Sequence, residues 1–224
     1  MRFKHIIWDY DGTLFDTYPV MAAAFRDALS ERGIVETTDE IMSFMKVSMR
    51  EAKTHYTDKY CLDDTFFARF DTLRKRKEIE STMPFDGVVD LCKSIVAQGA
   101  NNYLFTHRGE SAFYYMEKYK LLPLFTEVIT AERGFASKPS PEAVLYIMSA
   151  HEFQCDDAII IGDRDIDILS GQNAGIHSCY YSNQGEKSNI AEYCVESITE
   201  LWGVLGILNI AHVPVLASMT GASI

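Results

Sequence analysis

Short apolar runs alternate with helical patterns along most of the chain. The first run, residues 3–8, is rich in bulky side chains and predicts a buried strand. Similar runs lie at residues 103–105, 128–129, 158–161 and 178–181. Strands that alternate with helices favour a parallel sheet covered by helices on both faces. In such a sheet, ligands bind beyond the carboxyl ends of the strands.

Three of the intervening segments carry start or stop signals for helices. Residues 88–98 form one helical pattern, which Gly99 ends, and residues 165–174 form another, which Gly175 ends. A third helix is expected to begin at Ser140, with serine as N-cap and the following proline as the first helical residue. The sequence therefore predicts a Rossmann-like α/β core.

Residues 17–83 interrupt this alternation, because they carry helical patterns and no convincing strand. The apolar stripes of this segment are Met21, Phe25 and Leu29, and then Phe66, Phe67, Phe70 and Leu73. We therefore predict a helical cap domain, residues 17–83, inserted after the first strand of a core domain formed by residues 1–16 and 84–224.

The composition is ordinary for a globular protein, and the charge is informative. The chain has 224 residues, of which 47% are hydrophobic and 24% charged, with a formal net charge of -11. A negative field disfavours nucleic acid and anionic membrane as partners. It would also repel an anionic substrate, so a site for an anion must supply positive charge locally.

The five cysteines and the chain termini indicate a cytoplasmic protein. The cysteines are scattered without a C-x-x-C spacing, which argues against disulfides or a zinc site. We expect no secretory signal and no membrane span, since no stretch approaches about 20 apolar residues. The apolar tail, residues 203–224, is expected to pack or to form an interface, which leaves a monomer or a homodimer open.

Two acids directly follow the first predicted strand, in the sequence Asp9-Tyr10-Asp11-Gly12-Thr13. Carboxylates two residues apart project to the same side of an extended segment. Such a pair is costly unless a cation or a shared proton compensates it. One acid could attack phosphorus while the other transfers protons. The alternative is an ordinary turn of the Asp-x-Asp-Gly type.

Thr106 and Lys138 are the next candidates. Thr106 ends the second predicted strand, where a hydroxyl can hold a phosphate, although it could instead cap the following helix. His107 is interpreted as a polar strand-end residue and not as a catalyst. Proline after Lys138 keeps that lysine in a loop, where it could neutralise a phosphoryl oxygen or simply be solvated.

A cluster of acids follows the fourth predicted strand, in Gly162-Asp163-Arg164-Asp165-Ile166-Asp167. Asp163 and Asp167 are four positions apart, so the start of a helix would place them on one face. Clustered carboxylates suit Mg²⁺. Asp165 lies off that face and is expected to complement the helix dipole, as all three acids could.

These four segments, in this order, resemble the haloacid dehalogenase superfamily. The matching patterns are Asp-x-Asp-Gly-Thr, a strand-ending threonine, an isolated lysine and Gly-Asp-x-x-x-Asp, which span residues 9–167. The helical insertion is similar to the cap of the phosphoglycolate phosphatase-like branch. Arg164 departs from the small residue expected at its position. The resemblance does not extend to the tail beyond Trp202.

The resemblance implies a magnesium-dependent phosphatase that acts on a small phosphorylated metabolite. It assigns Asp9 as nucleophile, Asp11 as general acid/base, and Thr106 and Lys138 to phosphate binding. It assigns the metal to Asp9, Asp163, Asp167 and the backbone carbonyl of Asp11. Because Asp11 must gain and lose a proton, its pKa is expected near the working pH. A phosphosugar mutase and a non-catalytic phospholigand-binding protein remain alternatives.

Selectivity for the leaving group is expected to come from the helical insertion. Residues 45–50 lie between two helical patterns and are interpreted as a loop. Lys46 or Arg50 in this loop could contact an anionic or polar leaving group. The alternative is that both are solvated surface charges.

Overall fold

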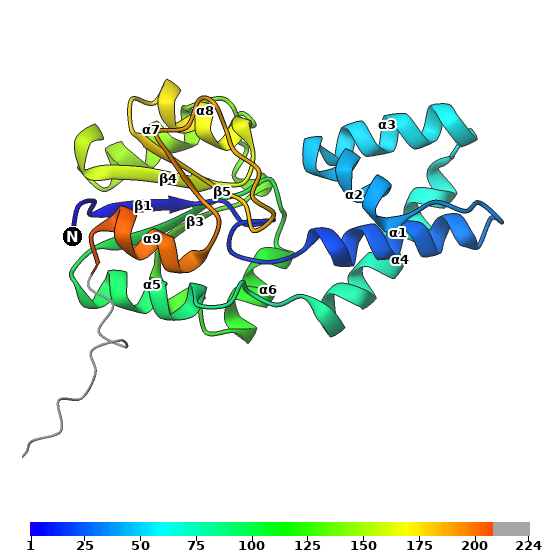
Figure 1. The fold of residues 1–224 in the computed structure, drawn as a ribbon, viewed down its shortest axis with the longest axis horizontal. Helices are drawn as coiled ribbons and strands as arrows, with labels where there is room; N and C mark the ends of the chain where they lie inside the picture. The colour runs from blue at the N-terminus through cyan, green and yellow to red at the C-terminus, as the bar shows by residue number, and fades with distance from the viewer. Residues whose placement is uncertain (208–224) are drawn as a thin grey trace, which may run out of the picture.

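A parallel sheet forms the centre of the molecule, whose computed structural model describes residues 1–207 (Figure 1). The 6-stranded sheet has the order β3-β2-β1-β4-β5-β6, and every neighbouring pair is parallel. Its strands are β1 (His5–Trp8), β2 (Asn101–Phe105), β3 (Phe125–Ile129), β4 (Ala158–Gly162), β5 (His177–Tyr181) and β6 (Tyr193–Val195). The α/β fold predicted from the sequence is confirmed. The order in which the chain adds strands to the sheet reverses between β1 and β4. A ligand site is therefore expected at the carboxyl ends of these two strands.

Two sets of helices cover the sheet, because alternate strand residues point to opposite faces. Ile6 and Trp8 of β1 pack in one apolar cluster, while Ile7 lies in another. The first cluster is completed by α5 (Val88–Ala97), α6 (Ser111–Lys118) and α9 (Ile198–Leu205). The second contains residues of α7 (Glu142–Ala150), and α8 (Asp165–Asn173) lies on the same side of the sheet (Figure 1). Short 3-10 turns are η1 (Leu122–Leu124), η2 (Ala131–Arg133) and η3 (Cys155–Asp157).

Several elements differ from those that the sequence predicted. β2 begins at Asn101, earlier than its apolar run, because the buried Asn102 is fully hydrogen-bonded. Its amide accepts from Trp8 Nε1 at 2.9 Å and donates to two backbone carbonyls. β6 has only three residues, too short a run to predict a strand, so it was not predicted. α7 begins at Glu142, with Pro141 as its N-cap, so the predicted cap at Ser140 is wrong by one residue.

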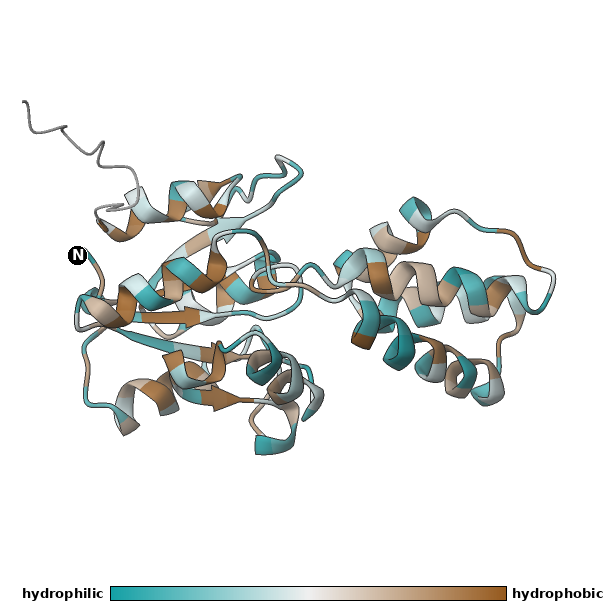
Figure 2. Cartoon of the chain, turned by 90° about the horizontal axis from the view of Figure 1, so that it is seen from below, coloured by the Kyte–Doolittle hydropathy of each residue, from teal (hydrophilic) through white to brown (hydrophobic). Residues whose placement is uncertain are grey.

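The inserted segment forms four helices with an apolar cluster of their own. These are α1 (Tyr18–Ser30), α2 (Thr38–Val47), α3 (Met49–Tyr60) and α4 (Asp64–Ser81). All buried members of this cluster lie between Tyr18 and Leu73. Figure 2 shows this part as a lobe joined to the sheet by two adjacent segments. Those segments pair through an antiparallel bridge between Phe15 and Pro84. The cluster supports a domain boundary near residues 17 and 83, which stays a prediction.

The end of the described chain packs against the sheet. Leu205 and Ile207 are buried in the cluster that contains Ile6 and Trp8. The remainder of the predicted packing or interface tail, residues 208–224, lies outside the described residues. Across residues 1–207, no helix is both long and apolar enough to cross a membrane.

Candidate active site

The strand ends bring the predicted site residues together at one edge of the sheet. Asp9 directly follows β1, Thr106 follows β2, and Asp163 follows β4. The Asp9 backbone N–H donates to the carbonyl of Ile161 at 2.9 Å, which fixes the end of β1 against β4. Lys138 enters from the loop before α7.

Three carboxylates form a compact buried group. One oxygen each from Asp9, Asp163 and Asp167 lies within 4.8 Å of the others. The reason is not the predicted shared helix face, because Asp163 precedes α8 and Arg164 is extended, with φ -132° and ψ 151°. Asp167 instead occupies the first turn, where its Oδ2 accepts from the Arg164 backbone N–H at 3.1 Å. The extended residue turns Asp163 back toward Asp167.

Lys138 supplies a buried positive charge to this group. Its Nζ lies 2.5 Å from Asp9 Oδ1 and 2.7 Å from Asp167 Oδ1. Burial alone would lower the pKa of Lys138, but the two carboxylates outweigh it and raise that pKa. The lysine is therefore cationic and not a solvated surface residue. Its backbone N–H donates to His107 Nε2 at 2.9 Å, so His107 helps to fix this loop.

Lys138 and Arg164 do not form hydrogen bonds with every oxygen of these acids, so part of the negative charge stays without a partner. Burial and the neighbouring Asp167 raise the pKa of Asp9, and burial with the same neighbour raises the pKa of Asp163. Asp9 Oδ2 and Asp163 Oδ1 are buried and have no hydrogen-bond partner among residues 1–207. Arg164, which the sequence left unexplained, places Nε 3.9 Å from both Asp163 Oδ1 and Asp167 Oδ2. Buried oxygens in this arrangement fit a divalent cation with oxygen ligands.

Asp11 is held by an arginine that was not predicted. Arg108 is 7% exposed, and its Nη2 and Nε donate to Asp11 Oδ1 at 2.6 Å and 3.1 Å. The same guanidinium donates to both oxygens of Glu78, at 2.9 Å and 3.1 Å. Glu78 belongs to α4 and is 1% exposed. A buried carboxylate of the insertion therefore contacts the candidate acid/base through one arginine.

These contacts determine the charge of Asp11. Burial would raise its pKa, but Arg108, together with a hydrogen bond from Thr17 at 2.7 Å, holds the pKa below its ordinary value. In this arrangement Asp11 is an anion, in contrast to the pKa near the working pH expected from its role. Thr106 Oγ accepts from the Arg108 backbone N–H at 3.0 Å. Thr106 does not cap α6, which begins only at Ser111.

Gly12 allows the acid loop to pass close to the carboxylate group. Its φ is +79°, in the left-handed region that favours glycine. A Cβ atom at this position would overlap the Asp163 carboxylate and the Tyr18 ring. The position requires glycine both for its backbone and for lack of space.

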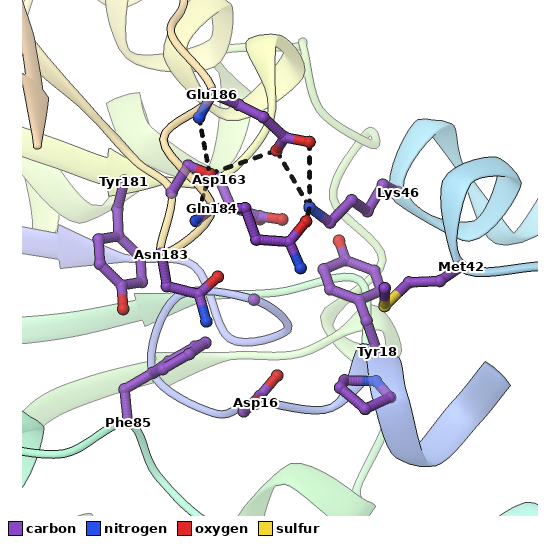
Figure 3. Close-up of a pocket in the computed structure, with 13 residues that line it drawn as sticks. Asp16, Tyr18, Met42, Lys46, Phe85, Asp163, Tyr181, Asn183, Gln184 and Glu186 are labelled. Carbon is purple, nitrogen blue, oxygen red and sulfur yellow. Dashed lines mark hydrogen bonds and ion pairs between the residues drawn. The ribbon is translucent and has the colours of Figure 1, made fainter. Parts of the chain in front are cut away.

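Lys46 and Arg50 differ in their surroundings. Ser48 alone separates α2 from α3, so the interpretation of residues 45–50 as a loop is wrong. Lys46 lies in the last turn of α2 and lines a pocket next to Gly12 and Asp163 (Figure 3). Its Nζ donates to Gln184 Oε1 at 2.8 Å and lies 3.0 Å from Glu186 Oε2. Arg50 is exposed and does not line this pocket.

Comparisons with known proteins agree with the predicted family. The sequence profile described as haloacid dehalogenase-like hydrolase matches residues 6–181. A phosphoglycolate phosphatase from Aliivibrio fischeri is 28% identical over 223 residues, which cover 93% of this chain and 98% of that protein. These matches support the prediction of a phosphoric monoester hydrolase.

Solved structures show the same fold. The crystal structure of a hydrolase from Streptococcus pneumoniae is 32% identical, with a TM-score of 0.69, and covers 92% of this chain and 100% of that one. The HAD-hydrolase YfnB from Bacillus subtilis, solved bound to magnesium, is 23% identical with a TM-score of 0.74. That comparison covers 92% of this chain and 100% of the other.

Proposed function

Since the chain belongs to the haloacid dehalogenase-like hydrolase family, we propose that it is a magnesium-dependent phosphatase of small phosphomonoesters. In this proposal Asp9 attacks phosphorus and carries the phosphoryl group as an aspartyl phosphate. The observation that carries the proposal is the position of the Asp9 carboxylate. It lies at a strand end, 2.5 Å from the buried Lys138 ammonium and beside two further carboxylates.

Asp9, Asp163 and Asp167 would hold the magnesium ion, together with the backbone carbonyl of Asp11. The unpartnered buried oxygens of Asp9 and Asp163 support this assignment, and Mg²⁺ prefers a few carboxylates plus water. When bound, the ion would neutralise charge on the phosphoryl oxygens. The magnesium-bound structure of YfnB, which shares this fold, is consistent with the proposal.

The remaining residues would neutralise charge and transfer protons. Phosphoryl transfer needs in-line attack and compensation of oxygen charge more than covalent help from other side chains. Lys138 would compensate a phosphoryl oxygen, and the Thr106 hydroxyl would bind another. Asp11 in its protonated form would give its proton to the leaving alkoxide, and the resulting carboxylate would accept a proton from the water that hydrolyses the aspartyl phosphate. Its anionic state beside Arg108 suits the second of these steps.

Turnover of p-nitrophenyl phosphate tests the proposal directly. Wild-type protein should hydrolyse this ester with Mg²⁺ and lose turnover after chelation. Asp9→Asn should remain folded and lose at least about a thousandfold in turnover, because a neutral amide cannot form the phosphoenzyme. Activity of this variant within tenfold of wild type, with deamidation excluded by mass spectrometry, would refute the nucleophile. Binding of phosphate without any turnover by wild type would favour the non-catalytic alternative.

A further inference from the structure

A cavity lies between the proposed phosphoryl site and the insertion. Gly12 and Asp163 form its inner side, α2 contributes Met42 and Lys46, and the loop after β5 contributes Glu186 (Figure 3). An ester whose phosphorus lies at Asp9 would extend its alcohol into this space, because Gly12 and Asp163 border both regions. The cavity is therefore the place where the leaving group would be selected.

The cavity is small and suits a short leaving group. Its volume is about 60 Å³. One water molecule needs about 10–15 Å³ on the same measure. The space accommodates a few non-hydrogen atoms beyond the phosphate.

The charges around the cavity are predominantly negative. Acidic side chains are Asp16, Asp163 and Glu186, while Lys46 is the one cationic side chain of its lining. Asp163 also faces the proposed magnesium site. Among residues 1–207, the half-buried Asp16 carboxylate has no ion-pair partner and accepts no hydrogen bond. The part of the lining that faces a leaving group thus contains two acids and one lysine.

The charge of Lys46 is already compensated. Its ammonium contacts both carboxylate oxygens of Glu186, at 3.0 Å and 3.2 Å, and donates to the side-chain Oε1 of Gln184 at 2.8 Å. Ser182 Oγ also contacts Glu186 Oε2, at 3.3 Å, and so holds the acid in place. A carboxylate that binds Lys46 would have to share this ammonium with Glu186. With the pair intact, the leaving-group side has two acids, Asp16 and Glu186, for one lysine.

Aromatic rings complete the lining. Tyr18, Phe85 and Tyr181 border the cavity, and the last two rings lie 5.2 Å apart in an edge-to-face arrangement. The Tyr18 hydroxyl is buried, and within the described part of the chain it has no hydrogen-bond partner. Ring faces together with a free carboxylate favour a cation or a hydrogen-bond donor over an anion.

From these observations we infer that the cavity selects against a leaving group that carries a carboxylate and favours a short alcohol that carries an ammonium group. This inference rests on the proposed phosphatase function and specifies its substrate class. An uncharged hydroxyl-bearing alcohol ranks between the two, because Asp16 can accept its hydrogen bond without charge repulsion.

Three esters of nearly equal length test the ranking. They are 2-aminoethyl phosphate, 2-hydroxyethyl phosphate and phosphoglycolate, which end in ammonium, hydroxyl and carboxylate. With Mg²⁺, kcat/KM should fall in that order, by about tenfold or more from first to last, because single charges interact at short range near a protein surface. If phosphoglycolate is the best of the three, the inference is wrong.

Charge variants separate the effect of the cavity from the intrinsic reactivity of each ester. Glu186→Gln frees Lys46, so it should raise kcat/KM for phosphoglycolate by about tenfold and lower it for 2-aminoethyl phosphate. Asp16→Asn should shift the ranking in the same direction. The matched control is Asp90→Asn, which removes an exposed acid paired with Lys93 at 3.3 Å on α5. This control should leave the ranking unchanged.

The outcomes distinguish this inference from the proposed function. A ranking that shifts in Glu186→Gln and not in Asp90→Asn supports the inference. Equal changes for all three esters in Glu186→Gln refute it, while turnover of p-nitrophenyl phosphate keeps the phosphatase function intact. If wild-type protein with Mg²⁺ hydrolyses neither these esters nor p-nitrophenyl phosphate, the proposed function fails and the inference fails with it.

Discussion

Arg108 compensates two acids that are far apart in the sequence, the buried Glu78 and the partly buried Asp11. It donates to Asp11 in the core and to Glu78 in α4, and its guanidinium lies 5.0 Å from the centre of the Tyr10 ring. A network of this kind is costly to break, because removal of one partner leaves the others buried and charged. The arginine therefore matters for stability as well as for the position of Asp11.

Arg108→Met should lower the free energy of unfolding by about 3–5 kcal/mol, since Asp11 loses its ion pair and the buried Glu78 keeps only Arg74, 3.3 Å away. Urea denaturation measures this change. Adding Glu78→Gln to the variant should restore part of the loss, because a buried charge with incomplete compensation is then removed. The control is Arg69→Met, which breaks an exposed ion pair with Glu31 and should cost about 1 kcal/mol or less. Similar losses in the two single variants would contradict the network.

Gly12→Ala should lower turnover of p-nitrophenyl phosphate by about a hundredfold, because the added methyl displaces Asp163 and Tyr18. Gly33→Ala is a matched control. Its φ is +73°, similar to that of Gly12, yet nothing lies within 4 Å of the added atom. The left-handed backbone should cost each variant about 1 kcal/mol of stability, and the overlap should cost Gly12→Ala about 1–3 kcal/mol more, while only Gly12→Ala loses turnover. Equal turnover in the two variants would show that the close packing at Gly12 is unimportant.

At the scale of helices and strands, the sequence predicted the elements whose pattern is local. The buried runs of β1 and β4 and the stops at Gly99 and Gly175 were found because they depend on neighbouring residues. β6 was missed because its short segment becomes a strand only by pairing with β5. The proximity of Asp9, Thr106 and Asp163 was predictable, since parallel strands end at the same edge.

Long-range partners explain what the sequence did not predict at the site. Glu78 lies among the charged residues of α4, and nothing local distinguishes it from its exposed neighbours. Its burial depends on Arg108, which is 30 positions further along the chain. Arg108 itself had a usable signal, because it follows a strand end that already contained a candidate residue. Lys46 was a candidate, but its pairing with Glu186, 140 positions away, was not predictable.

Lys46 and Arg50 lie on different helices, α2 and α3, so their substitution should have different effects on selectivity. Lys46→Ala should lower kcat/KM for phosphoglycolate by about tenfold, because it removes the cation of the cavity lining. Turnover of p-nitrophenyl phosphate should change little. Arg50→Ala, one helix away and exposed, should leave kcat/KM for both esters within about twofold. Equal losses on both esters in Lys46→Ala would indicate general damage instead of selectivity.

At the scale of the whole molecule, a net charge of -11 must be reconciled with a phosphate ester as substrate. Local positive charge makes this possible, because Lys138 and Arg164 lie next to the clustered carboxylates. They do not neutralise this group completely, as the unpartnered oxygens of Asp9 and Asp163 indicate. A bound divalent cation would both stabilise the fold and make the site attractive to an anion.

Magnesium should therefore raise the melting temperature of the chelated protein, because it binds the folded site and not the unfolded chain. At about 100 times Kd the gain is about 2.7 kcal/mol, which is several degrees for a chain of this size. Asp163→Asn should abolish the shift. Its melting temperature in chelator should equal or exceed that of wild type, because one of three crowded carboxylates is gone. A full magnesium shift in this variant would exclude Asp163 as a ligand.

The contact between Glu78 and Arg108 limits how freely this lobe could be exchanged for another. A chimera that carries a foreign insertion on the same sheet would leave a guanidinium buried without its second carboxylate. Grafting would succeed only where the donor lobe presents an acid at the corresponding turn of its last helix. Exchange of the lobe is therefore limited by the charge of one side chain of α4, whatever leaving group the site accepts.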